Sequence, residues 1–188
     1  MQVLKEEIRS SILENATLIF REEGFRRGSM RDIAGLCGVS LGNLYHYFAS
    51  KEEILLGIVS PCMDELEALL GANCLEDVPS LSSALCGFLY TYRTPLHILL
   101  LESEGSKVES FAKSLPERIS QWALGQKEGI LSRHPALPER FLDLGLRLAA
   151  MDIYGLVLEI TRGDIARDEA LCFIERRLSF DRERCISL

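Results

Sequence analysis

Apolar residues recur at intervals of three and four along most of the chain, which is the spacing of one face of an α-helix. In the first segment, Ile8, Ile12, Ala16, Ile19 and Phe20 form such a stripe, and charged residues lie off it. No convincing segment alternates apolar and polar residues, as a half-buried strand would. The pattern therefore predicts an all-α fold.

Glycine, proline and serine divide this pattern into nine expected helices. Gly24 is suited to the left-handed conformation that ends a helix. Ser29 is followed three residues later by Asp32, and Ser50 by Glu53, which is the pattern of a helix N-cap. After the first helix, which ends at Gly24, we expect helices over residues 30–37, 41–47, 51–70, 81–92, 95–104, 108–131, 139–161 and 166–180.

The charge of the chain is unevenly distributed. Its formal net charge is −7, yet residues 24–51 hold four cations and one carboxylate, a local net charge of +3 that leaves −10 elsewhere. The N-terminal residues have no continuous apolar core, so we expect neither a secretory signal nor a membrane anchor, and a cytoplasmic location. The overall acidity argues against a protein that coats nucleic acid, and the split puts a small basic patch on an otherwise acidic chain.

The stretch "GVSLGNLYHYFASKEE" has the features of a helix-turn-helix, in which a second short helix enters the major groove of DNA. Gly38 suits the sharp turn between the helices at 30–37 and 41–47. Leu44 and Phe48 are expected to face inward, which directs Tyr45 and Tyr47 outward. A tyrosine offers an apolar ring to a thymine methyl group and a hydroxyl to a phosphate without adding charge.

The segment "SMRDIAGLCGVSLGNLYHYFASKEEIL" resembles the DNA-binding signature of the tetracycline-repressor (TetR) family of bacterial transcriptional regulators. The resemblance extends back over "ILENATLIFREEGF" and covers residues 8–55. It implies an all-α homodimer in which residues 1–50 form a three-helix DNA-binding domain and residues 51–188 a helical domain for effector binding and dimerisation. It further implies a repressor that a small effector releases from a pseudo-palindromic operator in double-stranded DNA, with no enzymatic activity, metal or cofactor.

The resemblance also suggests which residues contact DNA. Gly28 stands where the family often has threonine, and Leu41 where it often has a polar or basic residue, so the phosphate contacts usual there are not implied. Tyr47 has an alternative role in packing, and His46 one as a bystander in the groove. The predicted DNA-binding residues are Ser29, Arg31, Ser40, Leu41, Gly42, Asn43, Tyr45, His46 and Lys51.

The C-terminal part supplies a dimerisation hypothesis and a set of ligand candidates. Residues 141–160 are long enough to span a bilayer but contain four charged residues, so a dimer-forming helix is expected, joined by the last helix in a four-helix bundle. Asp152 interrupts this apolar run and has an alternative role in an interhelical hydrogen bond. The run "PLHILLLE" and the pair Tyr90 and Tyr92 suggest a largely apolar effector. The ligand-binding candidates are Tyr90, Arg93, His97, Trp122, Gln126, Asp152 and Tyr154.

An enzyme and a helical adaptor are the two alternative classes of function. The three histidines, His46, His97 and His134, stand apart without a nucleophile or metal motif, which argues against an enzyme. A helical adaptor that has lost DNA binding remains an alternative, and Leu41 favours it. The six cysteines form no CxxC pair, so buried thiols are favoured over a redox switch.

Overall fold

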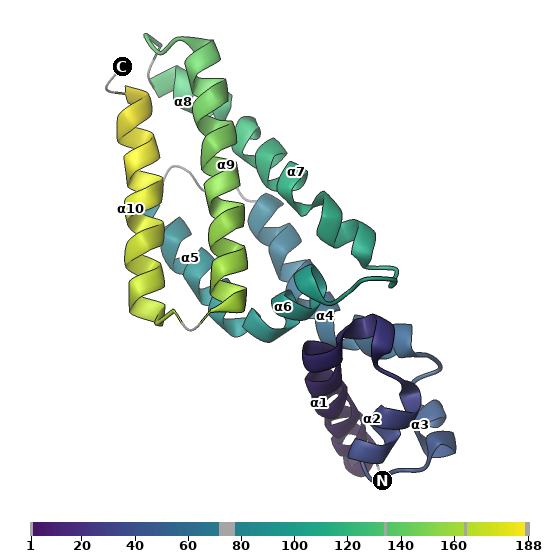
Figure 1. The fold of residues 1–188 in the computed structure, drawn as a ribbon. Helices are drawn as coiled ribbons and strands as arrows, with labels where there is room; N and C mark the ends of the chain where they lie inside the picture. Colours follow the sequence, from purple (N-terminus) through teal and green to yellow (C-terminus); the bar gives the residue numbers. More distant parts are fainter. Residues whose placement is uncertain (1, 72–77, 134, 164, 187–188) are drawn as a thin grey trace. The chain divides into compact units, whose positions relative to one another are not determined.

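A computed structural model describes residues 2–71, 78–133, 135–163 and 165–186. In these residues the chain forms ten α-helices and no strand, which confirms the predicted all-α fold (Figure 1). The helices are α1 (Gln2–Arg27), α2 (Met30–Leu36), α3 (Leu41–Tyr47), α4 (Lys51–Gly71), α5 (Val78–Thr91), α6 (Arg93–Leu101), α7 (Glu109–Gly125), α8 (Lys127–Arg133), α9 (Glu139–Arg162) and α10 (Arg167–Ile186).

The helices group into two compact units that do not follow chain order. The first, which we call the head, consists of residues 1–64 and 94–113. The second, the body, consists of residues 65–93 and 114–188. Helix α4 therefore begins in the head and ends in the body. The expected division at residue 51 stays a prediction about which segments bind DNA and which bind an effector.

Gly24 interrupts α1 near its end. Its backbone has φ 78° and ψ 161°, outside the helical region, and Phe25 beyond it donates its N–H to the carbonyl of Glu102 at 2.8 Å. A Cβ atom at Gly24 would lie 2.8 Å from Oε2 of Glu102. The positive φ favours glycine, whereas the Glu102 carboxylate is the end of a flexible side chain that can move aside, so the backbone conformation confirms the predicted break at Gly24.

The core of the head closes around α1. Leu44 and Phe48, predicted to face inward, are both fully buried. Side chains from α1 to α4 meet there, so the short helices are held by shared burial as well as by their own backbone hydrogen bonds. The buried core includes Ile12, Ala16, Phe20, Ile33, Leu44, Phe48, Ile54 and Leu55.

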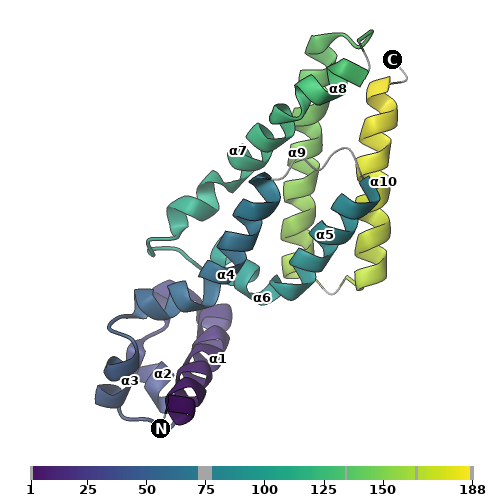
Figure 2. The same ribbon diagram turned by 180° about the vertical axis from the view of Figure 1, so that it is seen from behind.

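In the body, α9 and α10 lie side by side, and α5 packs against α10 (Figures 1 and 2). Each contributes an apolar face to the core, including Leu89 from α5, Leu146 and Val157 from α9, and Ile174 from α10. This arrangement leaves the opposite face of α9 outside the core.

The expected single helix over residues 108–131 is wrong, because the structure divides it into α7 and α8. The N–H of Gln126 donates to the carbonyl of Ala123 at 3.1 Å, a bond three residues back that ends α7. In α8, the ammonium of Lys127 lies 2.6 Å from Glu139 and 2.8 Å from Asp143, both in α9. These ion pairs, between residues far apart in the sequence, orient α8.

Candidate nucleic-acid interface

Serine hydroxyls begin the short helices of the head. The Oγ of Ser29 accepts the N–H of Asp32 at 3.2 Å, and the Oγ of Ser40 accepts the N–H of Asn43 at 3.1 Å. At the start of α4, Ser50 accepts the N–H of Glu53 at 3.2 Å. Each bond satisfies a helix N–H that has no partner within the helix, so the predicted caps are confirmed.

The turn between α2 and α3 depends on Gly38, which has φ 65°. Its N–H donates to the carbonyl of Gly35 at 3.2 Å, and the next N–H, of Val39, donates to Ala34 at 3.1 Å. These bonds satisfy the last carbonyls of α2. The chain therefore reverses within a few residues, as a helix-turn-helix requires.

Helix α3 presents one apolar and one mixed face. Tyr45 is 50% exposed, and His46 is also exposed, whereas Tyr47 is half-buried. The C-terminus of α3 is held by Arg9, whose Nη1 donates to the carbonyl of Tyr47 at 3.5 Å and whose guanidinium carbon lies 4.4 Å from the centre of the Phe48 ring. The half-burial of Tyr47 agrees with a packing role.

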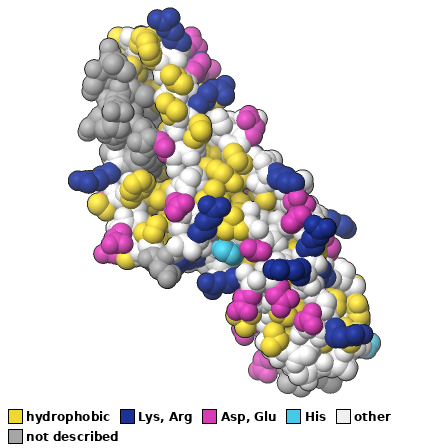
Figure 3. Space-filling view, viewed as in Figure 1, with side chains coloured by type: hydrophobic (Ala, Val, Ile, Leu, Met, Phe, Trp, Pro, Cys, Tyr) yellow, Lys and Arg dark blue, Asp and Glu magenta, His cyan; other side chains and the backbone are white. Residues whose placement is uncertain are grey.

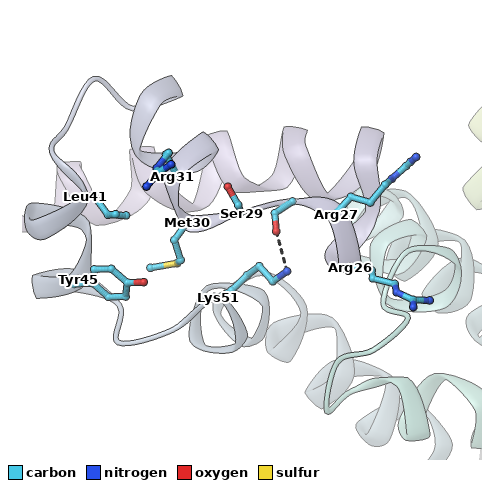
Figure 4. Close-up of a pocket in the computed structure, with 9 residues that line it drawn as sticks. Arg26, Arg27, Ser29, Met30, Arg31, Leu41, Tyr45 and Lys51 are labelled. Carbon is cyan, nitrogen blue, oxygen red and sulfur yellow. Dashed lines mark hydrogen bonds between the residues drawn. The ribbon is translucent and has the colours of Figure 1, made fainter.

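A cleft of about 550 Å³ lies between the end of α1, the start of α2, α3 and the start of α4 (Figure 4). Four cationic side chains and no carboxylate line it. Figure 4 shows Tyr45 and Leu41 reaching it from α3, with the thioether of Met30 between Tyr45 and Lys51. The lining residues are Arg26, Arg27, Gly28, Ser29, Met30, Arg31, Leu41, Tyr45 and Lys51.

The cleft brings together only part of the predicted set. Ser40, Gly42, Asn43 and His46 do not line it, although all four belong to the start or the exposed side of α3. It also includes residues that sequence reasoning left out. Met30 carries no polar group that would have marked it, and Arg26 and Arg27 were indistinguishable from solvated cations.

Gly28 is buried at the corner between α1 and α2. A Cβ atom there would lie 2.7 Å from Cγ2 of Ile19 and 3.3 Å from Cδ1 of Phe20. A threonine at this position would therefore require both side chains to move. The departure from the family's pattern at Gly28 thus has a packing cause in this chain.

The two arginines at the corner differ in their partners. Arg26 forms an ion pair with Glu104 at 2.9 Å, in which the side chains are 75% and 69% exposed. An ion pair so exposed stabilises the fold little and is weakened by salt. Arg27 donates its Nε to the carbonyl of Glu23, one helical turn back, at 2.8 Å, and its side chain is exposed.

Lys51, predicted to contact phosphate, has its ammonium directed at the protein. Its Nζ donates to the carbonyl of Phe25 at 2.5 Å and to that of Gly28 at 2.8 Å. It also lies 4.3 Å from the centre of the Phe25 ring. Partial burial lowers the pKa of Lys51 below its usual value, and the neighbouring carboxylate of Glu52 opposes that shift.

The seven ligand candidates are divided between the two units. The hydroxyl of Tyr90 donates to the carbonyl of Ile165, between α9 and α10, at 2.6 Å, and Nε of Arg93 donates to that of Ile160, in the last turn of α9, at 2.9 Å. His97 belongs to the head and the other six to the body. Half-buried side chains are found at Trp122, Gln126, Asp152 and Tyr154. Their ligand contacts stay a prediction.

None of the helices in the described part of the chain has the length and apolarity needed to cross a bilayer.

Residues 12–58 match the family described as bacterial regulatory proteins, tetR family. The HTH-type transcriptional regulator UidR of Escherichia coli K12 is 24% identical over 174 residues, which cover 89% of each chain. The HTH-type transcriptional repressor KstR2 of Mycobacterium tuberculosis H37Rv is 43% identical over 60 residues, or 32% of this chain and 30% of its own.

Solved structures resemble the whole chain in fold. MexZ, a repressor responsible for antibiotic resistance in Pseudomonas aeruginosa, has a TM-score of 0.67 at 23% identity and covers 96% of this chain and 95% of its own. AibR, solved with isovaleryl coenzyme A and operator DNA, has a TM-score of 0.61 at 20% identity, with coverages of 90% and 96%. At these identities the likeness concerns the fold.

Proposed function

We propose that the chain is a member of the TetR family of bacterial regulatory proteins, whose model residues 12–58 match, and that it is a repressor that binds a pseudo-palindromic operator as a homodimer and is released by a small effector. The relatives named above are transcriptional regulators, which favours a DNA-binding regulator over an enzyme. The proposal includes repression, the effector and the residues in contact with DNA.

The cationic cleft of the head is the observation that carries DNA binding. A chain with net charge −7 places four cations around one cleft without a carboxylate among the lining residues. Phosphate contacts dominate the affinity of proteins for DNA, so this local charge favours a duplex as partner. We assign phosphate contacts to Ser29, Arg27 and Arg31, which lie exposed or half-exposed at the cleft.

Helix α3 is the proposed recognition helix. At its start, Gly42 leaves open space above the backbone, because nothing lies within 4 Å of a Cβ built there, and Asn43 next to it is half-exposed. A duplex can therefore approach this end closely, where an amide side chain can pair with a base edge. Tyr45 and His46 then face the duplex one turn later, while the caps of Ser29 and Ser40 hold the two helices.

A homodimer is supported by an exposed apolar stripe on α9. Phe141, Leu144, Leu148 and Met151 are 48%, 56%, 51% and 70% exposed, and their spacing of three, four and three places them on one helical face. Figure 3 shows apolar side chains exposed over this helix. Phe173 adds a further 54%-exposed ring from α10. A second copy that covers this stripe would complete a four-helix bundle.

The effector is proposed to bind in the body. AibR, which has a similar fold, was solved with both isovaleryl coenzyme A and operator DNA, so one such chain can hold both kinds of ligand. The effector would release DNA only if it bound more tightly to a dimer whose heads are spaced unsuitably for successive major grooves, about 34 to 36 Å apart. We keep a largely apolar organic effector as the working hypothesis.

A helical adaptor without DNA binding is the second candidate. The observation that favours it is Leu41, an apolar residue that lines the cleft where a polar contact would strengthen binding to phosphate. An adaptor would show no salt-sensitive preference among DNA sequences.

The test is selection of bound fragments from the source genome by the purified protein. We expect a dimer that retains specific fragments with an affinity that falls steeply as salt rises. Tyr45→Ala should weaken specific binding while leaving the dimer intact, and Tyr45→Phe separates the contribution of the ring from that of the hydroxyl. A monomer that retains no fragment at low salt would overturn the proposal.

A further inference from the structure

The ammonium of Lys51 is surrounded by groups of its own head. Two of its three N–H donors are taken by the carbonyls of Phe25 and Gly28, at 2.5 and 2.8 Å. The ring of Phe25 lies 4.3 Å away. The dashed line in Figure 4 starts at the ammonium of Lys51 and marks its bond to the carbonyl of Gly28.

These two carbonyls belong to the corner between α1 and α2. The left-handed Gly24 breaks α1, so the carbonyls after it lack the regular partners of a helix interior. Both Phe25 and Gly28 are buried residues, where an unpaired carbonyl is costly. Lys51 supplies, from the start of α4, the donors that this corner needs.

The corner carries side chains assigned to DNA. Arg27 stands on it, and Ser29, the cap of α2, follows directly. The direction of these groups depends on the backbone of residues 25–28, which the single ammonium of Lys51 bridges. Contact between Lys51 and a phosphate would have to compete with both carbonyl bonds.

We propose that Lys51 is a positioning residue, which holds the corner of residues 25–28 so that its neighbours meet the duplex, and is not itself a phosphate contact. The inference rests on the proposed DNA-binding function. It reverses the role that the sequence suggested for this lysine. The partial burial that lowers the pKa of Lys51 agrees with an ammonium engaged by the protein.

The experiment compares Lys51→Met, which keeps the length of the side chain but removes the charge, with Arg27→Met as the matched control at an exposed cation. Each full-length protein is titrated with two duplexes of equal length, one selected by the wild-type protein from a random library and one unselected. Affinity is measured over a range of salt concentrations. Circular dichroism and sedimentation verify that helix content and dimerisation are unchanged.

For Arg27→Met we expect weaker binding of both duplexes by the same factor and a salt slope smaller by about 0.9, the loss of one phosphate contact. For Lys51→Met we expect the preference for the selected duplex to fall by about ten-fold or more. The salt slope of Lys51→Met on the unselected duplex should stay at the wild-type value. Binding to that duplex needs no fixed alignment with particular bases, so the arginines can still contact phosphates.

The proposal is overturned if Lys51→Met behaves like Arg27→Met, or if it changes neither preference nor slope. Should Lys51→Met fail to fold, the wild-type protein is titrated with the selected duplex, and the NMR resonance of the Lys51 Nζ tests the proposal. An unmoved resonance supports positioning, and a shift comparable to that of the Arg27 side chain overturns it. A wild-type protein that binds neither duplex would remove the proposed function and this inference together.

Discussion

In the head, α2, α3 and α4 each begin at a serine whose hydroxyl accepts a backbone N–H, whereas in the body α9 begins at Pro138 without a side-chain cap. The helices of the head end at glycines with positive φ, and cationic side chains donate hydrogen bonds to backbone carbonyls near these ends. The body instead leaves an apolar stripe on α9 exposed. The head is thus specified largely by residues a few positions apart, while the body has a surface that one chain does not cover.

The largest expected effect breaks the head at its core. Phe48 is fully buried, and the guanidinium of Arg9 packs against its ring. Phe48→Ala should therefore destabilise the head by about 3 to 5 kcal/mol. Denaturant unfolding measures the change. Leu36→Ala, at a residue 58% exposed on α2, serves as the control and should change stability by about 0.5 kcal/mol or less. Equal losses in the two variants would contradict the assigned core.

A second prediction concerns the uncovered face of the body. Introducing charge by Leu144→Glu together with Leu148→Glu should raise the dimer dissociation constant by about 100-fold or more, because both positions lie in the middle of the exposed stripe. Sedimentation velocity measures the dissociation. Leu18→Glu, at a leucine 53% exposed on α1 in the head, should leave the dimer unchanged. A double variant that still dimerises like the wild type would place the interface elsewhere.

The third prediction uses the pH dependence of a buried thiol in the head. Burial, helped by the charge of Asp64, raises the pKa of Cys62 from 9.0 to about 12. The folded protein therefore keeps a proton that the unfolded chain releases above pH 9, so stability is complete below pH 9 and falls between pH 9 and 12. The loss should be about 1.4 kcal/mol per pH unit.

The free energy of unfolding, measured between pH 8 and 11 in steps of about one unit, isolates the contribution of the Cys62 thiol. Cys62→Ala should show a smaller decline with pH than the wild type does. Cys172→Ala, at an exposed cysteine of α10, is the control and should decline as the wild type does. Parallel curves for all three proteins would show that Cys62 is not buried as described.

The smallest expected effect sharpens the role of Tyr90 in the body. Because its hydroxyl donates to the carbonyl of Ile165, Tyr90→Phe should destabilise the protein by about 1 kcal/mol without any effector present. Thermal unfolding measures this, with Tyr154→Phe as a half-buried control on α9. Unchanged stability combined with altered effector binding would instead favour the ligand role suggested by the sequence.

Much of the head could be predicted because its signals are local. The caps at Ser29, Ser40 and Ser50 and the turn glycines Gly24 and Gly38 each act within about four residues, so their spacing is visible in the sequence. The inward faces of α3 followed from helical period alone. The division between α7 and α8 was missed, because a long helical period continues across Gln126 while ion pairs to α9 set the direction of α8.

The candidate site could be predicted only in outline. Residue types and resemblance indicated Arg31, Leu41, Tyr45 and Lys51, all of which line the cleft. They did not indicate Met30, whose apolar side chain resembles any core residue until the fold places it beside Tyr45 (Figure 4). Nor did they indicate that Tyr90 and Arg93 bond to backbone carbonyls 75 and 67 residues away.

By itself, the amino-acid sequence determined that this chain is helical, where its short helices begin and turn, and which face of each is apolar. Those properties arise from hydrogen bonds and side-chain spacing within one or two helical turns. Only the tertiary structure decided which groups the cationic side chains bind. Lys51 donates to carbonyls 26 and 23 residues away, and Arg26 pairs with Glu104 at a separation of 78 residues. Charge reveals that a lysine attracts an oxygen, but the packing of helices decides which oxygen is within reach.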